Sequence, residues 1–359
     1  MRAMRRSIAV LTALGLTLSA CSGSTAEETT TTSSTTTTTT TIQETTTTSP
    51  TTTVDDRETS PVNGLPVDDP ELLNRRVLAV KIDNHPNARP QSGLNEADVV
   101  MEVLVEGVTR FISLWLQSDS DYLGPMRSGR PTDASLLPAF GEPSFAISGA
   151  QAWVQSLIRS KDIHLIGEVR PATFRVSWRS APHNLYTDTN LLREYADGRD
   201  YPNDALEGPI WEFGDLPTGG TDLESVGFNF SGNQTEWTWD ETEGLWLRSA
   251  SGRESMYREE DGDTSRLGFP VMVALNVQQY TASPSSGGGT SLPSSRTTGS
   301  GTAYVFADGR VIEGTWERET ESDWFTLQDA DGNVIPVPPG KIWISFVPGT
   351  SGVTLNPAG

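Results

Sequence analysis

The sequence predicts an α+β protein in which a mixed α/β N-terminal domain (residues 62–213) precedes a smaller, mostly β C-terminal domain (residues 222–357). In the first half, apolar strand-like runs alternate with segments whose apolar residues recur at helical spacing. In the second half, short alternating runs are joined by turns rich in Asp and Gly. The segment 214–220 contains glycine and proline and lies where the pattern changes, as is typical of a linker.

The first twenty residues have the features of a bacterial lipoprotein signal peptide. Three arginines precede an apolar run that is shorter than the about 20 residues needed to span a bilayer. The run ends in Leu-Ser-Ala-Cys21, which matches the bacterial lipobox, and Cys21 is the single cysteine of the chain. We therefore expect cleavage before Cys21, lipid attachment to it, and an extracytoplasmic protein anchored to the bacterial cell membrane. The fold must form without disulfides.

Residues 21–61 consist mainly of threonine runs broken by Ser, Glu, Pro and Gln. Such a composition cannot bury apolar surface, so we expect a disordered tether. The formal net charge of −21 argues against a nucleic-acid partner and against membrane binding through a basic patch. The lipid on Cys21 is therefore the expected link to the membrane. An anionic envelope polymer or an envelope protein is the expected partner.

The expected elements follow from apolar periodicity, taken in chain order. In the first half, Val-, Ile- and Leu-rich runs predict strands, and two later segments with helical spacing predict helices, the second capped by Asp188 or Thr189 and ended by Gly198. The second half holds short alternating strands and a flexible Ser/Gly/Pro-rich loop. These predictions cover strands 77–83, 97–105 and 111–117, a helix containing Trp153, Leu157 and Ile158, strands 228–230, 237–239, 245–247 and 271–277, and the loop 282–301.

Polar residues gather in four segments of the first half: 83–93, 102–110, 124–131 and 180–186. The first of these directly follows a predicted buried strand, and loops in that position often bind ligands. We therefore expect ligand binding by residues of these segments. The candidates are Asp83, Asn84, His85, Arg89, Glu102, Glu106, Arg110, Arg127, Ser128, Arg130, His183, Asn184 and Tyr186.

Catalytic chemistry has weaker support in these residues. On a strand, the Cα atoms of Glu102 and Glu106 would lie about 13 Å apart. This exceeds the about 5–9.5 Å that separates the two carboxyl groups in glycosidases. A salt bridge from these glutamates to Arg110 or Arg127 is the favoured interpretation. No Gly-x-Ser-x-Gly motif is present, and Ser128 would need a histidine as its base.

A metal site would have Asp83, His85 and His183 as its candidate ligands. The chain has three histidines in total and no His-Glu-x-x-His motif, so loop-fixing hydrogen bonds are the favoured role for these histidines. We accordingly predict no metal and no cofactor.

Anion binding is the chemistry that the residue types favour most. Arg89, Arg110, Arg127 and Arg130 concentrate positive charge in an acidic chain, and a helix predicted to start near Arg130 would add free N–H groups. The alternative is that these arginines neutralise Asp98, Glu102 and Glu106 within the fold. Both interpretations stay open at this point.

The chain resembles the YerB-like bacterial lipoproteins, a family with N- and C-terminal domains of unknown function. The resemblance covers nearly all of residues 62–357 and is carried by segments 82–93, 102–110, 124–131, 181–186, 276–277, 309–316 and 339–343. It implies a two-domain envelope lipoprotein. It implies no reaction, so it assigns no catalytic residue.

These observations favour a non-enzymatic module that binds an anionic envelope ligand or a protein partner. The alternative is a hydrolase or transferase that acts on envelope polymers. In that case Glu102, Glu106, His85 or His183 would serve as acid or base, and their side chains would have to converge in one cleft.

Overall fold

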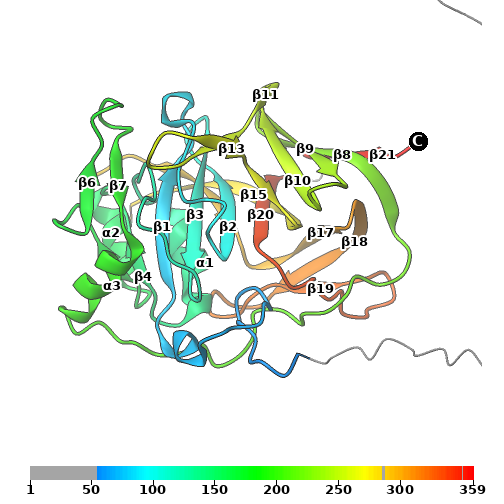
Figure 1. Ribbon diagram of the computed structural model, residues 1–359, viewed down its shortest axis with the longest axis horizontal. Helices are drawn as coiled ribbons and strands as arrows, with labels where there is room; N and C mark the ends of the chain where they lie inside the picture. Colours follow the sequence, from blue (N-terminus) through cyan, green and yellow to red (C-terminus); the bar gives the residue numbers. More distant parts are fainter. Residues whose placement is uncertain (1–54, 285–287, 350) are drawn as a thin grey trace, which may run out of the picture. The chain divides into compact units, whose positions relative to one another are not determined.

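The computed structural model describes residues 55–284, 288–349 and 351–359, which belong to one compact unit from Val54 to Gly359 (Figure 1). The expected signal peptide, Cys21 and most of the expected tether lie outside the described residues. The chain is already packed a few residues before position 62, since Ser60 is buried and Glu58 accepts a hydrogen bond from the backbone of Val67. The tether was therefore predicted slightly too long. Within the described ranges, no helix is long and apolar enough to cross a membrane.

One mixed sheet runs through both halves of the chain (Figure 1). In the first half, neighbouring strands pair in the order β5-β4-β1-β3-β2, and in the second half the order is β20-β15-β17-β18. The two halves join where β2 and β20 pair in parallel. The strands are β1 (Leu78–Asp83), β2 (Val99–Leu104), β3 (Thr109–Trp115), β4 (Ser144–Ala146), β5 (His164–Ile166), β15 (Val271–Ala282), β17 (Gly299–Ala307), β18 (Arg310–Arg318) and β20 (Ile342–Pro348).

Further strands of the second half pair in the order β21-β8-β9-β10, and the short β11 and β14 pair with β10. Two small hairpins, β6/β7 and β12/β13, stand apart from both groups. The bounds are β6 (Thr173–Arg175), β7 (Leu185–Thr187), β8 (Thr221–Phe230), β9 (Asn233–Asp240), β10 (Leu245–Ala250), β11 (Arg253–Glu254), β12 (Met256–Arg258), β13 (Thr264–Arg266), β14 (Gly268–Phe269), β16 (Leu292–Arg296), β19 (Thr326–Gln328) and β21 (Val353–Pro357).

Helices are few and short. They are α1 (Pro131–Leu136), α2 (Ala152–Arg159) and α3 (Thr189–Asp197), with 3₁₀ turns η1 (Pro70–Asn74), η2 (Pro86–Ala88) and η3 (Leu137–Phe140). Asp188 caps α3 as predicted, because its carboxylate accepts hydrogen bonds from the backbone of Asn190 and Leu191. The β-rich character of the chain is confirmed, although the helical part of the first half is smaller than the prediction of a mixed α/β domain suggests.

The three predicted strands of the first half correspond to β1, β2 and β3, with ends that differ by at most two residues. The predicted flexible loop 282–301 is wrong in part. Strand β16 lies inside it and pairs with the end of β15, and β17 starts at Gly299. Its many Ser, Gly and Pro residues give this segment a loop-like composition, but pairing with the long β15 satisfies the backbone of β16.

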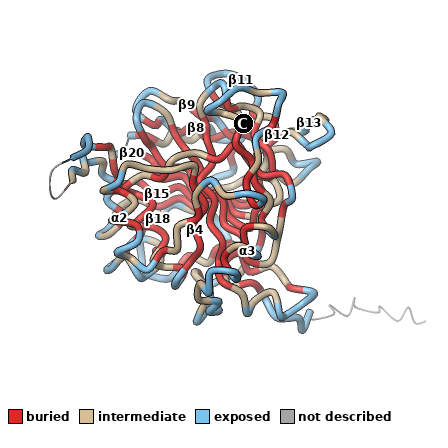
Figure 2. Tube along the Cα trace, turned by 90° about the vertical axis from the view of Figure 1, so that its left-hand side faces the viewer, coloured by how far each residue is buried: buried red, intermediate tan, exposed pale blue. Residues whose placement is uncertain are grey.

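Both faces of the central strands β1, β2, β3 and β20 are buried, which explains their near-continuous apolar runs, whereas β18 alternates buried and exposed residues. On β2, Met101 and Val103 belong to one core cluster, whereas Val100 belongs to the other. On β20, Ile344 and Trp343 divide in the same way. The strands at the centre of the unit are accordingly buried, and exposed residues gather in the loops (Figure 2). Each core cluster contains residues from both halves of the chain.

A buried ion pair lies where the halves meet. Glu102 on β2 and Arg248 on β10 are both almost fully buried, and an Nη of Arg248 lies 2.8 Å from Oε1 of Glu102. The Arg248 guanidinium also stacks on the rings of Phe111, Trp237 and Trp343 at 5.4–5.9 Å. Removal of either partner would leave an uncompensated charge in an aromatic environment.

We therefore expect Arg248→Met to lower the free energy of unfolding by about 3–5 kcal/mol. The double variant Glu102→Gln/Arg248→Met should lose less, because it removes both charges and keeps an acceptor for the Thr109 hydroxyl. Urea unfolding of both variants measures the difference. Equal losses in the two variants would show that packing, rather than the unpaired charge, sets the cost.

Candidate functional site

The candidate site lies at the end of β1, around the carboxylate of Asp83. Asp83 is almost fully buried, and its Oδ2 lies 2.7 Å from Nδ1 of His183 and 3.2 Å from Nε of Arg127. Its Oδ1 accepts a hydrogen bond from the backbone N–H of His85. The register of β1 and β3 places Arg110 directly opposite Asp83. Four of the predicted segments therefore meet at one carboxylate.

The two histidines of the site stack on each other. The ring centroids of His85 and His183 are 4.7 Å apart and the ring planes differ by 13°. Nδ1 of His183 faces a carboxylate acceptor, so it carries the proton, whereas Nδ1 of His85 accepts from the backbone N–H of Asn87. The hydrogen bonds therefore impose opposite tautomers on the two neutral rings.

Arg110 and Arg127 supply positive charge beside these rings. Arg110 is largely buried and donates to the backbone carbonyl of Ser128, a neutral acceptor. Its Nε is buried without a hydrogen-bond partner among the described residues. Burial, and the nearby charges of Arg130 and Arg127, lower the pKa of Arg110 to about 10. Arg127 is close enough to Asp83 for an ion pair, but its Nε is not aligned for a hydrogen bond.

Other predicted residues serve the framework. Arg130 pairs with Glu106 at 2.8 Å, and Glu102 pairs with Arg248. The predicted salt bridges from these two glutamates to Arg110 or Arg127 are therefore wrong. Asp98 accepts backbone N–H groups of the segment after β3, so the arginines do not neutralise it directly.

The predicted free helix N-terminus at Arg130 is also wrong. Helix α1 has only six residues, and the carboxylate of Asp133 accepts the hydrogen bond of the Arg130 backbone N–H. The same carboxylate bonds the ammonium group of Lys81. The N-terminus of α1 is thus already occupied by a negative group of the chain itself.

The remaining candidates have structural contacts. Asn184 bonds Arg175 and the backbone of Val176 within the segment that links β6 to β7. Tyr186 is buried with its ring 4.8 Å from that of Tyr122. The hydroxyl of Ser128 lies 3.5 Å from that of Ser148, at the limit of a hydrogen bond.

A buried hydrogen-bond relay ties the candidate site to the second half. Oε1 of Glu102 accepts from Arg248 and from the hydroxyl of Thr109, and that hydroxyl accepts from the amide of Asn84. Oδ1 of Asn84 in turn accepts from Arg89 and Gln91. Arg89 and Asn84 therefore fix the loop after β1. Sequence reasoning missed Arg248, because nothing in the local pattern marks a partner 146 positions away. It also left Thr109 and Gln91 out of the candidate residues, although both lie within the predicted polar segments.

Lys81 and Asp133 form a second buried pair that sequence reasoning missed. Both side chains are fully buried, and Nζ of Lys81 lies 2.6 Å from Oδ1 of Asp133. A lysine in an otherwise apolar strand, in a chain with only three lysines, was an available signal. Burial lowers the pKa of Lys81 to about 8 against the opposing effect of Asp133, and Arg110 and Arg130 lower it further.

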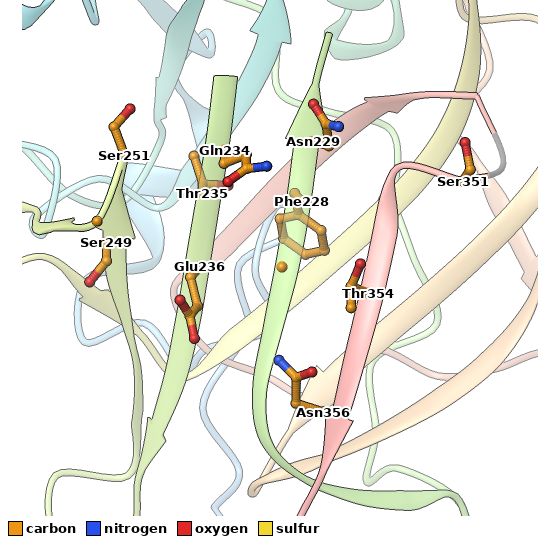
Figure 3. A pocket seen from close by; sticks show the side chains of 12 residues that line it. Phe228, Asn229, Gln234, Thr235, Glu236, Ser249, Ser251, Ser351, Thr354 and Asn356 are labelled. Carbon is orange, nitrogen blue, oxygen red and sulfur yellow. The ribbon is translucent and has the colours of Figure 1, made fainter. Parts of the chain in front are cut away.

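The described part of the chain has no group of three or more His, Cys, Asp or Glu arranged to hold a metal ion. A groove of about 380 Å³ lies elsewhere, on β8, β9 and β21 (Figure 3). Asn229, Gln234, Thr354 and Asn356 line it, together with Glu236. No predicted site residue lines this groove, and it offers no positive charge.

The comparisons with known proteins agree with this architecture. Residues 62–202 match the N-terminal domain, and residues 226–344 the C-terminal domain, of a protein family of unknown function, DUF3048. The chain belongs to this family of two-domain, YerB-like proteins, which confirms the resemblance.

One relative, described as "Putative lipoprotein YerB" of Bacillus subtilis, is 26% identical over 310 residues, which cover 83% of this chain and 86% of the relative. The crystal structure of YerB protein from Bacillus subtilis matches with a TM-score of 0.71 at 24% identity, covering 83% of this chain and 99% of that chain. This similarity supports the fold.

The stacked histidines should show opposite tautomers when neutral. Long-range ¹H–¹⁵N NMR at alkaline pH is expected to find the proton of His183 on Nδ1 and that of His85 on Nε2. Asp83→Asn should shift His183 toward the Nε2–H form, because an amide is a weaker acceptor than a carboxylate. A predominant Nε2–H form of His183 in the unsubstituted protein would contradict the assigned hydrogen bond.

Lys81 should make stability depend on pH in the alkaline range. Between pH of about 8 and the ordinary lysine pKa of 10.5, the unfolded chain holds a proton that the folded chain has released. The free energy of unfolding should therefore rise with pH in this window, by at most about 3 kcal/mol from this group.

Urea unfolding across the window, compared with Lys81→Met/Asp133→Asn, isolates this contribution from other titrating groups. The Asn side chain keeps an acceptor for the Arg130 backbone. The slope should be smaller in the double variant, and an identical slope would show that Lys81 stays protonated in the fold.

Proposed function

We propose that this chain is a lipid-anchored, extracytoplasmic binding module that holds an anionic group on the loops around Asp83. The N-terminal Leu-Ser-Ala-Cys21 motif and the lipoprotein description of the relative support the anchor. The ligand-binding part rests on the convergence of Arg110, Arg127 and the stacked histidines at the end of β1.

The main support for the proposal is the excess of positive over negative side chains around Asp83. Two guanidinium groups, Arg110 and Arg127, face one carboxylate, Asp83, which also bonds His183. Arg110 is held by a backbone carbonyl, and it forms no ion pair with any described carboxylate. The fold therefore fixes the Arg110 guanidinium without an ion pair, whereas Arg127 shares the Asp83 carboxylate with His183. A phosphate or carboxylate of a ligand would supply the missing acceptor.

One observation favours the alternative of a hydrolase or transferase acting on envelope polymers. Asp83 orients His183 through Nδ1, which leaves Nε2 free to exchange a proton, as in a catalytic Asp–His pair. Glu102 cannot share this role, because it is fully buried and paired with Arg248. In this alternative, His183 would be the acid–base group and the arginines would hold the substrate.

Arg127→Gln should weaken anion binding about tenfold to a hundredfold, the loss expected for one hydrogen bond to a charged group. Titration of the chain from Ser22 onward with inorganic phosphate, followed by NMR or calorimetry, measures the affinity. Arg127→Lys should give an intermediate result, because lysine keeps the charge and loses the planar fork.

Arg159→Gln is the matched control, since Arg159 lies on α2 and its side chain donates to that of Gln155 on the same helix. It removes the same charge and should leave phosphate affinity unchanged. Equal weakening in Arg127→Gln and Arg159→Gln would show a general charge effect and contradict the site. No phosphate binding by the unsubstituted chain would contradict the proposal itself.

A further inference from the structure

Trp178 is one of few large apolar side chains that are exposed in the described residues, with 42% of its surface accessible. Two arginines stack on its ring. The guanidinium carbons of Arg179 and Arg258 lie 4.2 Å and 4.3 Å from the ring centroid, and the indole N–H donates to the hydroxyl of Tyr122. The ring therefore holds two like charges close together, which cation–π attraction makes possible.

These two arginines are also fixed by neutral groups. Arg179 donates to the backbone carbonyls of Ala88 and Pro90, and Arg258 donates to that of Gly262. Within the described chain, neither has a carboxylate within ion-pair distance, and Nε of Arg258 is buried without a hydrogen-bond partner. Arg110 is held in the same manner at the first site. Backbone carbonyls orient such cations and leave their charge available for an anion.

The loop after β1 connects this cluster to the Asp83 site. His85 of the loop stacks on His183, whereas Ala88 and Pro90 of the same loop hold Arg179. The hairpin β12/β13 rests on the end of this loop, since the backbone N–H of Arg258 donates to the carbonyl of Gln91. The loop after β1 therefore contacts both groups of arginines: it begins at Asp83, which pairs with Arg127, and its carbonyls hold Arg179.

We infer that Trp178, Arg179 and Arg258 form a second anion subsite, and that the ligand is a linear chain with repeated phosphate groups. This inference rests on the proposed function, because the first phosphate occupies the Arg110/Arg127 site. A single phosphate can fill only one of the subsites. A phosphodiester chain carries one negative charge per repeat and can fill both, so its affinity gains from the effective concentration of the second group.

The test compares chains of different length. The chain from Ser22 onward is titrated with inorganic phosphate, with tripolyphosphate and with long-chain polyphosphate. Expressed per phosphate group, which removes the statistical advantage of a long chain, the polymer should bind at least about tenfold more tightly than inorganic phosphate. Trp178→Ala and, separately, Arg258→Gln should remove this gain, whereas Arg127→Gln should weaken the binding of inorganic phosphate and of the polymer alike. Thermal melting confirms that the variants are folded, and Arg159→Gln is again the charge-matched control.

The outcomes separate the two proposals. If inorganic phosphate binds and Arg127→Gln weakens it, but the long polymer gains nothing or Trp178→Ala and Arg258→Gln lose nothing, the second subsite is overturned and the first stands. If neither phosphate nor polymer binds, both proposals fail. Equally tight binding of polyglutamate would overturn the assignment to phosphate. Binding to phosphatidylglycerol vesicles without binding to soluble polyphosphate would assign the bound phosphates to lipid headgroups. It would overturn the inference that the ligand is a linear phosphate polymer.

Discussion

The parallel pairing of β2 with β20, and the ion pair of Glu102 with Arg248 beside it, constrain the rest of the structure. A parallel pair needs strands that come from well-separated parts of a chain, and here they come from its two family halves. Glu102 lies on β2, opposite Ser345 of β20, so its buried carboxylate lies where the two halves of the chain pair. A buried ion pair of this kind is weak evidence for stability. It does disfavour any other register of β2 against β20, because a shifted register would leave one buried charge without its partner among aromatic rings.

This constraint reaches the candidate site through hydrogen bonds rather than through apolar contacts. From Glu102 the relay passes by way of Thr109 to Asn84, the residue that follows Asp83. Gln91 closes the loop by donating to the carbonyl of Asp83 and to Asn84. These hydrogen bonds join the side chains of Glu102, Thr109, Asn84 and Gln91 in one buried chain, which restrains the loop. The second half of the chain thereby positions a carboxylate that belongs to the first half.

The sequence predicted those parts of the molecule that depend on local pattern. Strands β1 to β3 are buried on both faces, so their apolar runs are unmistakable, and Asp188 caps α3 by local hydrogen bonds. The four polar segments were also identifiable, because each contains several charged or amide residues beside a strand. Partners that are distant in the sequence could not be identified in this way. The sequence favours Arg110 or Arg127 as the partner of Glu102, whereas its partner Arg248 lies on β10.

The arginines of the two candidate subsites differ from those of the framework around them in the groups that hold them. Arg130 and Arg248 form ion pairs with Glu106 and Glu102, so their charges are neutralised within the fold. Arg110, Arg179 and Arg258 face backbone carbonyls, which orient a guanidinium but neutralise none of its charge. In a chain with a formal net charge of −21, abundant carboxylates could have paired with these three. Burying a guanidinium against neutral acceptors costs desolvation free energy, and no ion pair compensates for it. That cost is understandable if the missing negative charge arrives with a ligand.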